Sequence, residues 1–171
     1  MTKVLRPFLD RWRLCAVLAS AAMLAIAHAF ETFGGLPPCP LCLRQREVYW
    51  TAIALGAAFM ILVRMPGGPR WREATCWVLG LVFLVGAGIA AYHAGVEWKW
   101  WPGPETCGVA GGGVSAGALD SFLRGAEIRA PRCDEAPWVF AGLSMAGWNA
   151  VASLALAALS VAAALRERGK Q

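Results

Sequence analysis

Four long runs with almost no charged side chains constrain this chain more than any other feature. They cover residues 14–30, 48–63, 76–92 and 138–165. Each is close to or longer than the roughly 17–25 residues that a helix needs to cross about 30 Å of hydrocarbon. Only 16% of the residues are charged and 58% are hydrophobic, whereas soluble domains carry about 25% charged residues. The sequence therefore predicts an integral membrane protein.

The runs are rich in Ala, Leu and Val and do not alternate between polar and apolar residues, which favours closed helices over barrel strands. We expect one all-α membrane domain over residues 1–171, a four-helix bundle with spans at about 14–33, 47–64, 74–93 and 138–165. The first run, with its basic start and the sequence Ala27-His28-Ala29, also has features of a cleavable signal peptide. Its length favours a retained helix.

The positive charges predict the orientation of the helices. Most Lys and Arg residues precede the first span, separate the second from the third, or follow the fourth. Positive residues favour the cytoplasmic side, so both termini should be cytoplasmic and the loops at about 34–46 and 94–137 should face outward. The positive-inside rule then accounts for the net charge of +5, so this charge does not indicate nucleic-acid binding. We expect the lipid bilayer, and no nucleic acid, as a partner.

The second outward loop is long and uneven in composition. Its glycine-rich stretch VAGGGVSAGA, residues 109–118, predicts a partly mobile segment. The stretch VEWKWWPG, residues 96–103, is typical of the headgroup region. It fits either an aromatic belt at a helix end or a short interfacial helix after the third span, and we favour the helix slightly. Glu97 and Glu105 are expected to face solvent.

The six cysteines fall into two groups. Cys15 and Cys76 lie near the cytoplasmic ends of spans, where we expect small buried apolar residues. The other four lie in the outward loops, where disulfides persist and three pairings are possible. The Cys-x-x-Cys spacing favours one bond within that motif and the second between the remaining two. Two purely structural disulfides remain an alternative. Because the second pair does not form a zinc-knuckle motif, we expect no zinc site. The outward cysteines are Cys39, Cys42, Cys107 and Cys133.

Two arginines follow the Cys-x-x-Cys motif on the side where positive charge is least expected. If a helix starts near Leu41, Arg46 lies one turn after Cys42 on the same face. It could then stabilise a Cys42 thiolate together with the positive end of the helix dipole. Alternatively, Arg44 and Arg46 both anchor the helix among headgroups, with Glu47 as a local partner.

These features together resemble the bacterial disulfide-bond formation protein B (DsbB) family. The resemblance rests on PPCPLC followed by Arg46, on YHAGVEWKWWPGPETC, on PRCDEAPW and on the four apolar runs. It implies a protein-dithiol:quinone oxidoreductase in the bacterial inner membrane. A periplasmic thioredoxin-like protein of the DsbA type would be its partner, and a membrane quinone, ubiquinone or menaquinone, its electron acceptor.

The resemblance also implies roles for individual residues. Cys107 would form a mixed disulfide with the partner, and Cys107 and Cys133 would pass electrons to Cys39 and Cys42. Cys42 would face the quinone and Arg46 would polarise both. His93 is a candidate for a hydrogen bond to the quinone, although a histidine at a helix end is more commonly a packed or interfacial residue.

Two other functions fit parts of this pattern. A vitamin K epoxide reductase-like enzyme also combines helices, thiols and quinone, but its Cys-x-x-Cys lies in the last helix of the core bundle, where this chain has no cysteine. A non-catalytic membrane adaptor held by two disulfides belongs to a different class. Oxidation of a reduced partner in the presence of a quinone distinguishes the enzyme from the adaptor.

Overall fold

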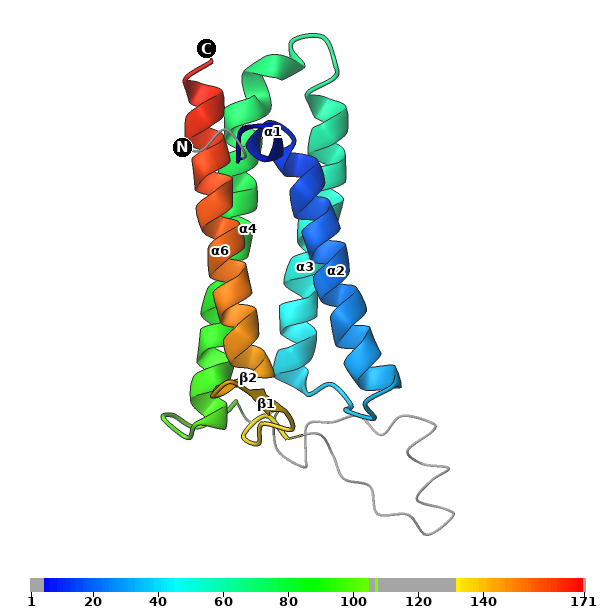
Figure 1. Ribbon diagram of the computed structural model, residues 1–171, viewed down its shortest axis with the longest axis vertical. Coiled ribbons are helices and arrows are strands. Elements are labelled where there is room, and N and C mark those ends of the chain that lie inside the picture. Colours follow the sequence, from blue (N-terminus) through cyan, green and yellow to red (C-terminus); the bar gives the residue numbers. More distant parts are fainter. Residues whose placement is uncertain (1–4, 105–106, 108–131, 171) are drawn as a thin grey trace.

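The computed structural model describes residues 5–104, 107 and 132–170, and this part of the chain is mostly helical (Figure 1). The elements, in chain order, are α1 (Leu5–Asp10), α2 (Trp12–Thr32), α3 (Pro40–Leu62), the 3-10 helix η1 (Gly68–Trp71), α4 (Arg72–Glu97), β1 (Val139–Phe140), β2 (Leu143–Ser144) and α6 (Met145–Arg168).

Three of the helices in the described part, α2, α4 and α6, are long and apolar enough to cross a membrane. Helix α3 is of similar length, 23 residues, but its first two turns carry Arg44, Arg46 and Glu47. With these charges, α3 is not among the helices that are apolar enough by composition to cross a membrane. The sequence predicts four spans, and composition supports three of them in the structure. Helix α3 corresponds to the remaining predicted span, for which composition alone does not establish a membrane crossing.

The long helices pack as two pairs. Helix α4 packs along α6, helix α2 packs along α3, and contacts between α3 and α4 join the pairs. Helices α2 and α6 touch each other little, and we call the boundary between them the α2/α6 seam. Both termini and α1 lie at one end of the molecule, and the β1–β2 hairpin lies at the other (Figure 1).

Small residues allow the pairs to approach closely. A Cβ atom at Gly86 of α4 would lie 2.8 Å from Val48 Cγ1 on α3 and 3.5 Å from Ser153 Oγ on α6. Glycine at this position lets three helices meet, which is how small residues promote helix packing in membranes.

Helix α6 begins at Met145 rather than near residue 138 because a hairpin precedes it. Strands β1 and β2 pair antiparallel around Ala141 and Gly142, whose φ angles are 49° and 79°. Two successive positive φ values make the tight turn that hairpins prefer. Ser144 then caps α6, because its side chain accepts a hydrogen bond from the Gly147 amide at 3.1 Å.

Helix α4 continues past the predicted end of its span at residue 93, as far as Glu97. We predicted a short interfacial helix after this span. That prediction is wrong for residues 98–101, which form turns and bends. Lys99 has a φ of 60° there, and the Trp101 indole folds back on α4, stacks on Tyr92 and donates to its carbonyl at 3.0 Å. The glycine-rich stretch 109–118, for which the sequence predicts mobility, lies outside the described residues, as does Glu105.

Candidate functional site

The Cys-x-x-Cys motif forms the N-terminus of α3. Pro40 occupies the first helical position, where its fixed φ suits a helix start. Cys39 is the N-cap, and its sulfur accepts a hydrogen bond from the Cys42 amide at 3.2 Å. The two sulfurs are free thiols that lie 2.7 Å apart. The neighbouring Cys42 sulfur and burial raise the pKa of the Cys39 thiol.

The second pair lies against the first. Cys107 and Cys133 form a disulfide with their Cα atoms 5.4 Å apart. Cys133 is fully buried in a small cluster with Cys39, and Cys42 and Cys107 pack against this cluster. Because the rest of the cluster, Leu41 and Val96, is apolar, the four sulfurs share one protected site at the hairpin end of the molecule.

His93 comes from α4 and meets the motif from the opposite side. Its Nε2 atom lies 3.6 Å from Cys39 Sγ, and Gln45 donates a hydrogen bond to its Nδ1 at 2.7 Å. Asn149 in turn donates to the Gln45 carbonyl and accepts from the Tyr49 hydroxyl. This hydrogen-bond network assigns the proton of the neutral imidazole to Nε2, which faces Cys39.

Arg46 lies one turn below Cys42, and its contacts cross to α2. The guanidinium donates to the Glu31 carboxylate at 2.7 Å and to the Ala27 carbonyl at 3.2 Å. Its side chain is only 13% exposed. Arg44, by contrast, is 69% exposed and pairs with Glu47 at 3.0 Å. The local Glu47 partner that anchoring predicts is therefore confirmed for Arg44, whereas Arg46 has a different partner and a buried position.

Glu97 is buried, and the prediction that it faces solvent is wrong. Its side chain is 3% exposed, because α4 extends one turn further than predicted and carries the carboxylate under the hairpin. Ser144 donates a hydrogen bond to one carboxylate oxygen. The other oxygen lies 3.9 Å from His93 Nε2.

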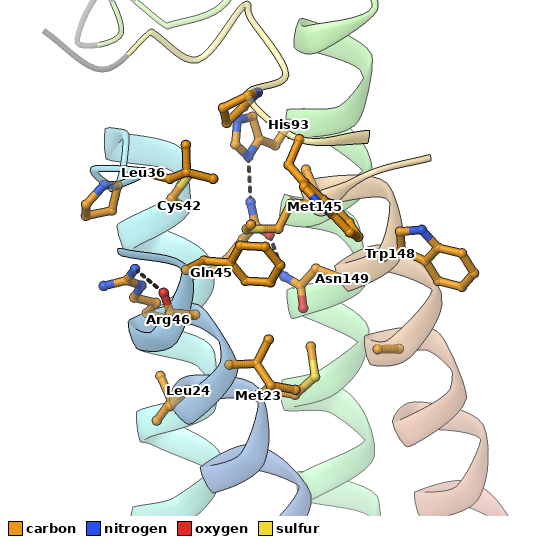
Figure 2. Close-up of a pocket in the computed structure, with 18 of the residues that line it drawn as sticks. Met23, Leu24, Leu36, Cys42, Gln45, Arg46, His93, Met145, Trp148 and Asn149 are labelled. Atoms are coloured by element: carbon orange, nitrogen blue, oxygen red, sulfur yellow. Dashed lines mark hydrogen bonds between the residues drawn. The ribbon is translucent and has the colours of Figure 1, made fainter. Parts of the chain in front are cut away.

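Cys42, Arg46, His93 and Glu97 all line a single cavity of about 380 Å³ (Figure 2). Its walls are mostly apolar and come from α2, from the segment before α3 and from the start of α6, with Met23, Leu36 and Trp148 among them. In Figure 2, His93, Gln45 and Asn149 form a hydrogen-bonded row along one side. The cavity is thus mostly apolar with a small set of polar lining residues, which are Cys42, Gln45, Arg46, Tyr49, His93, Glu97 and Asn149.

The structure brings all the predicted site residues to one end of the molecule and leaves the other two cysteines away from it. Cys76 is fully buried beside Arg13, whose guanidinium lies 3.6 Å from its sulfur. Cys15 is half-buried, with its sulfur 3.8 Å from the Phe8 carbonyl. Sequence reasoning did not identify five residues that complete the site, because each acts through a contact between helices; these are Glu31, Gln45, Tyr49, Ser144 and Asn149.

The Cys-x-x-Cys sulfurs and the His93 ring nitrogen are also potential metal ligands. One atom each of Cys39, Cys42 and His93 lies within 4.8 Å of the other two. Two thiolates and an imidazole suit a soft ion such as zinc. A disulfide between the cysteines would remove two of these three ligands.

Comparison with known proteins gives one consistent family. The family model described as disulfide bond formation protein DsbB matches residues 10–163. The chain belongs to the DsbB family. A disulfide bond formation protein B from Aromatoleum aromaticum is 31% identical over 95% of this chain and 93% of its own length. The DsbB relative from Marinobacter nauticus is 33% identical over 83% of this chain and 84% of its own. No solved structure gives a significant match.

Proposed function

We propose that this protein is a protein-dithiol:quinone oxidoreductase of the bacterial inner membrane. It reoxidises a periplasmic thioredoxin-fold dithiol of the DsbA type and passes the electrons to a membrane quinone, ubiquinone or menaquinone. Membership of the DsbB family supports this reaction class.

The proposed topology has four spans, with α3 crossing the membrane beside α2, α4 and α6. Helix α3 packs against both α2 and α4, so its polar first turns can lie at the outer surface while exposed apolar side chains of its remainder, such as Trp50 and Ile61, can face lipid. The distribution of positive charge supports cytoplasmic termini. The start of α3, where the four sulfurs cluster, lies at the end opposite the termini (Figure 1) and would then face the periplasm.

The packing of both cysteine pairs in one cluster carries the proposal. Disulfide exchange needs a thiolate to reach a disulfide sulfur. In the proposed order, the partner thiolate attacks Cys107 and forms a mixed disulfide, the second partner thiol resolves it, and Cys107 and Cys133 are left reduced. These thiols then reduce the bond between Cys39 and Cys42. The burial of Cys39 and Cys133 in the same cluster supports this second exchange.

The cavity fits a quinone head group. Ligand sites are mostly apolar pockets of about 300–1,000 Å³ with a few well-placed polar groups, and this cavity has that size and character. A bound quinone supplies a two-electron, two-proton acceptor. Cys42 would deliver the electrons. Arg46 would hold positive charge beside Cys42, and His93 would keep its Nε2 proton directed at this side of the cavity.

The cavity argues against the adaptor, and the position of the Cys-x-x-Cys motif argues against the vitamin K epoxide reductase type. A disulfide-held adaptor has no need of a pocket lined by one sulfur of its Cys-x-x-Cys motif. In the vitamin K epoxide reductase type the motif lies in the last helix of the core, whereas here it begins α3, and α6 contains no cysteine.

The test is partner oxidation by the purified protein in liposomes with ubiquinone or menaquinone. The native protein should oxidise a reduced thioredoxin-fold partner and reduce the quinone in equal amounts. Cys42→Ser should abolish quinone reduction while still forming a mixed disulfide at Cys107. If neither quinone is reduced by the native protein with an exchange-competent partner, the proposed function is wrong.

A further inference from the structure

Three soft ligand atoms approach one point at the start of α3. Cys39 Sγ, Cys42 Sγ and His93 Nε2 lie within 4.8 Å of one another, and Cys39 Sγ is 3.6 Å from Nε2. In a tetrahedral zinc site, bonds of about 2.3 Å to sulfur and about 2.0–2.1 Å to nitrogen place such a pair of atoms about 3.6 Å apart. Cys39 and His93 therefore already have the spacing of two zinc ligands.

The Cys42 sulfur is the ligand that has to move. The two sulfurs lie 2.7 Å apart, whereas tetrahedral zinc holds two sulfurs about 3.8 Å apart. Cys42 is half-buried and lines the cavity, so its side chain can turn toward the cavity. Cys39 stays in place, because the Cys42 amide donates to its sulfur at 3.2 Å. A backbone N–H of this kind also stabilises a metal-bound thiolate.

The hydrogen-bonded row behind His93 can support a metal at Nε2. A bound ion needs the imidazole proton on Nδ1. Rotation of the Gln45 and Asn149 amides by 180° exchanges their nitrogen and oxygen atoms without changing their shape. The Gln45 carbonyl then accepts from Nδ1–H, and Asn149 accepts from Gln45 and donates to Tyr49. The Tyr49 hydroxyl donates in turn to Ser153 Oγ, 2.9 Å away. The row keeps its hydrogen bonds in the reverse direction.

Glu97 lies beside the fourth position of such a site. Its Oε1 atom is 3.9 Å from His93 Nε2, and both residues line the cavity together with Cys42. Zinc with three protein ligands binds a water or another small ligand in its fourth position, and a water there can donate to this carboxylate. Burying a carboxylate is costly without a compensating charge. A divalent ion supplies the positive charge that a neutral imidazole does not.

We propose that the dithiol form of this protein binds one zinc ion through Cys39, Cys42 and His93, with the fourth position toward the cavity. Binding forms two zinc–sulfur bonds and one zinc–nitrogen bond and releases the protons of the two thiols, and no electron is transferred. The disulfide form has no thiolates to offer, so the site exists only in the reduced protein. The sequence-based expectation of no zinc site considered the cysteine spacing alone and did not include a histidine from α4.

The consequence of zinc binding for the reaction rests on the proposed function. Zinc holds the two sulfurs about 3.8 Å apart and engages both as ligands. The pair then cannot close to a disulfide and give its electrons to the acceptor. Zinc would therefore hold the enzyme in its reduced form, and removal of the ion would release it.

The first experiment titrates Co²⁺, a spectroscopic probe for zinc sites, into the full-length protein without quinone. The reduced protein should bind one ion per chain and show the visible bands of tetrahedral cobalt with thiolate ligands, and Zn²⁺ should displace them. The disulfide form should show no such bands. Equal binding by both forms, or no thiolate bands in the reduced form, would overturn the proposal.

Cysteine variants identify the sulfur ligands, because full reduction also opens the bond between Cys107 and Cys133. A Cys107→Ser, Cys133→Ser variant should keep the cobalt bands, and a Cys39→Ser, Cys42→Ser variant should lose them. The opposite pattern would place the ion at the other pair and contradict the assignment.

Histidine and glutamine variants test the nitrogen ligand. Loss of an outer-shell partner costs about 10–100-fold in metal affinity. Gln45→Leu should weaken Co²⁺ binding by that factor, and His93→Ala, which removes a ligand, should weaken it further. His28→Ala is the matched control, since His28 is the other histidine of the chain and is 54% exposed. Native affinity in His93→Ala would refute the ligand set.

The last experiment measures single-turnover quinone reduction by the reduced protein with and without Zn²⁺. The reaction should stop when one zinc ion per chain is bound, and a chelator should restore the zinc-free rate. An unchanged rate at full zinc occupancy would refute the inhibition. If the zinc-free protein reduces no quinone, the proposed function fails, whereas the cobalt bands still decide whether the metal site exists.

Discussion

Replacing Arg46 and Arg44 in turn should separate a cavity role from headgroup anchoring. The two arginines lie on the same helix, but Arg46 lines the cavity and is 13% exposed, whereas Arg44 is 69% exposed. Arg46 uses its two terminal nitrogens to reach Glu31 and the Ala27 carbonyl on α2. An ammonium group has no planar fork, so Arg46→Lys should keep the charge but lose one of these contacts.

The magnitude follows from the burial of the pair. A hydrogen bond to a charged group contributes about 1.5–3 kcal/mol, which is about tenfold to hundredfold in rate if it is lost in the transition state. Arg46→Ala should therefore slow quinone reduction by that factor, and Arg46→Lys by less. The fold should tolerate both changes, because Glu31 is 36% exposed and water can solvate it. The Arg44 pair is exposed on both sides and should contribute about 0–1 kcal/mol.

The assay is quinone-dependent oxidation of the reduced partner, with the apparent quinone affinity and maximal rate determined for each variant. Formation of the mixed disulfide at Cys107 serves as the control, since Arg46 does not contact that pair in the structure, and it should be unchanged. Equal and near-native quinone kinetics in Arg46→Lys, Arg46→Ala and Arg44→Ala would refute the reasoning and leave Arg46 as an anchor.

Three further predictions concern other parts of the molecule. Gly86→Ala should destabilise the protein by about 1–3 kcal/mol in detergent unfolding experiments, because the new methyl group meets the stiff Val48 side chain. Gly88→Ala on the same helix meets no atom within 4 Å and should be neutral or stabilising by up to about 1 kcal/mol; equal effects of the two changes would contradict the packing. The Cys15→Ala, Cys76→Ala double variant should retain native turnover, since both thiols lie at the end away from the cavity, and loss of turnover at normal expression would show that one of them takes part. Cys133→Ser should accumulate a covalent complex with the partner through Cys107, visible on non-reducing electrophoresis, and its absence would argue against Cys107 as the first point of attack.

The mostly helical fold and the closeness of the two Cys-x-x-Cys sulfurs could be predicted because both depend on local patterns. Uncharged runs indicate long helices, and the Cys-x-x-Cys spacing at a proline-marked helix start places both sulfurs together. The burial of Glu97 could not be predicted in this way, because it depends on one extra turn of α4 and on a serine far along the chain.

The partner of Arg46 was missed for the same reason. Glu31 is close to the end of α2, and only the packing of α2 on α3 brings it within 2.7 Å of the guanidinium. The chain from Tyr49 through Asn149 and Gln45 to His93 likewise joins three helices. Contacts between distant segments have no signature in a single sequence, whereas the caps and turns beside them do.

The weak contact across the α2/α6 seam affects how the protein must be handled in the laboratory. Met23 and Ala27 of α2 and Met145 and Ala152 of α6 line the same cavity from opposite sides of that seam. An isoprenoid tail can pass between two helices that adhere weakly, and so can the alkyl chain of a detergent. Detergent should therefore compete with the proposed quinone for the cavity, and apparent affinities for it measured in micelles should vary with the surfactant and its concentration.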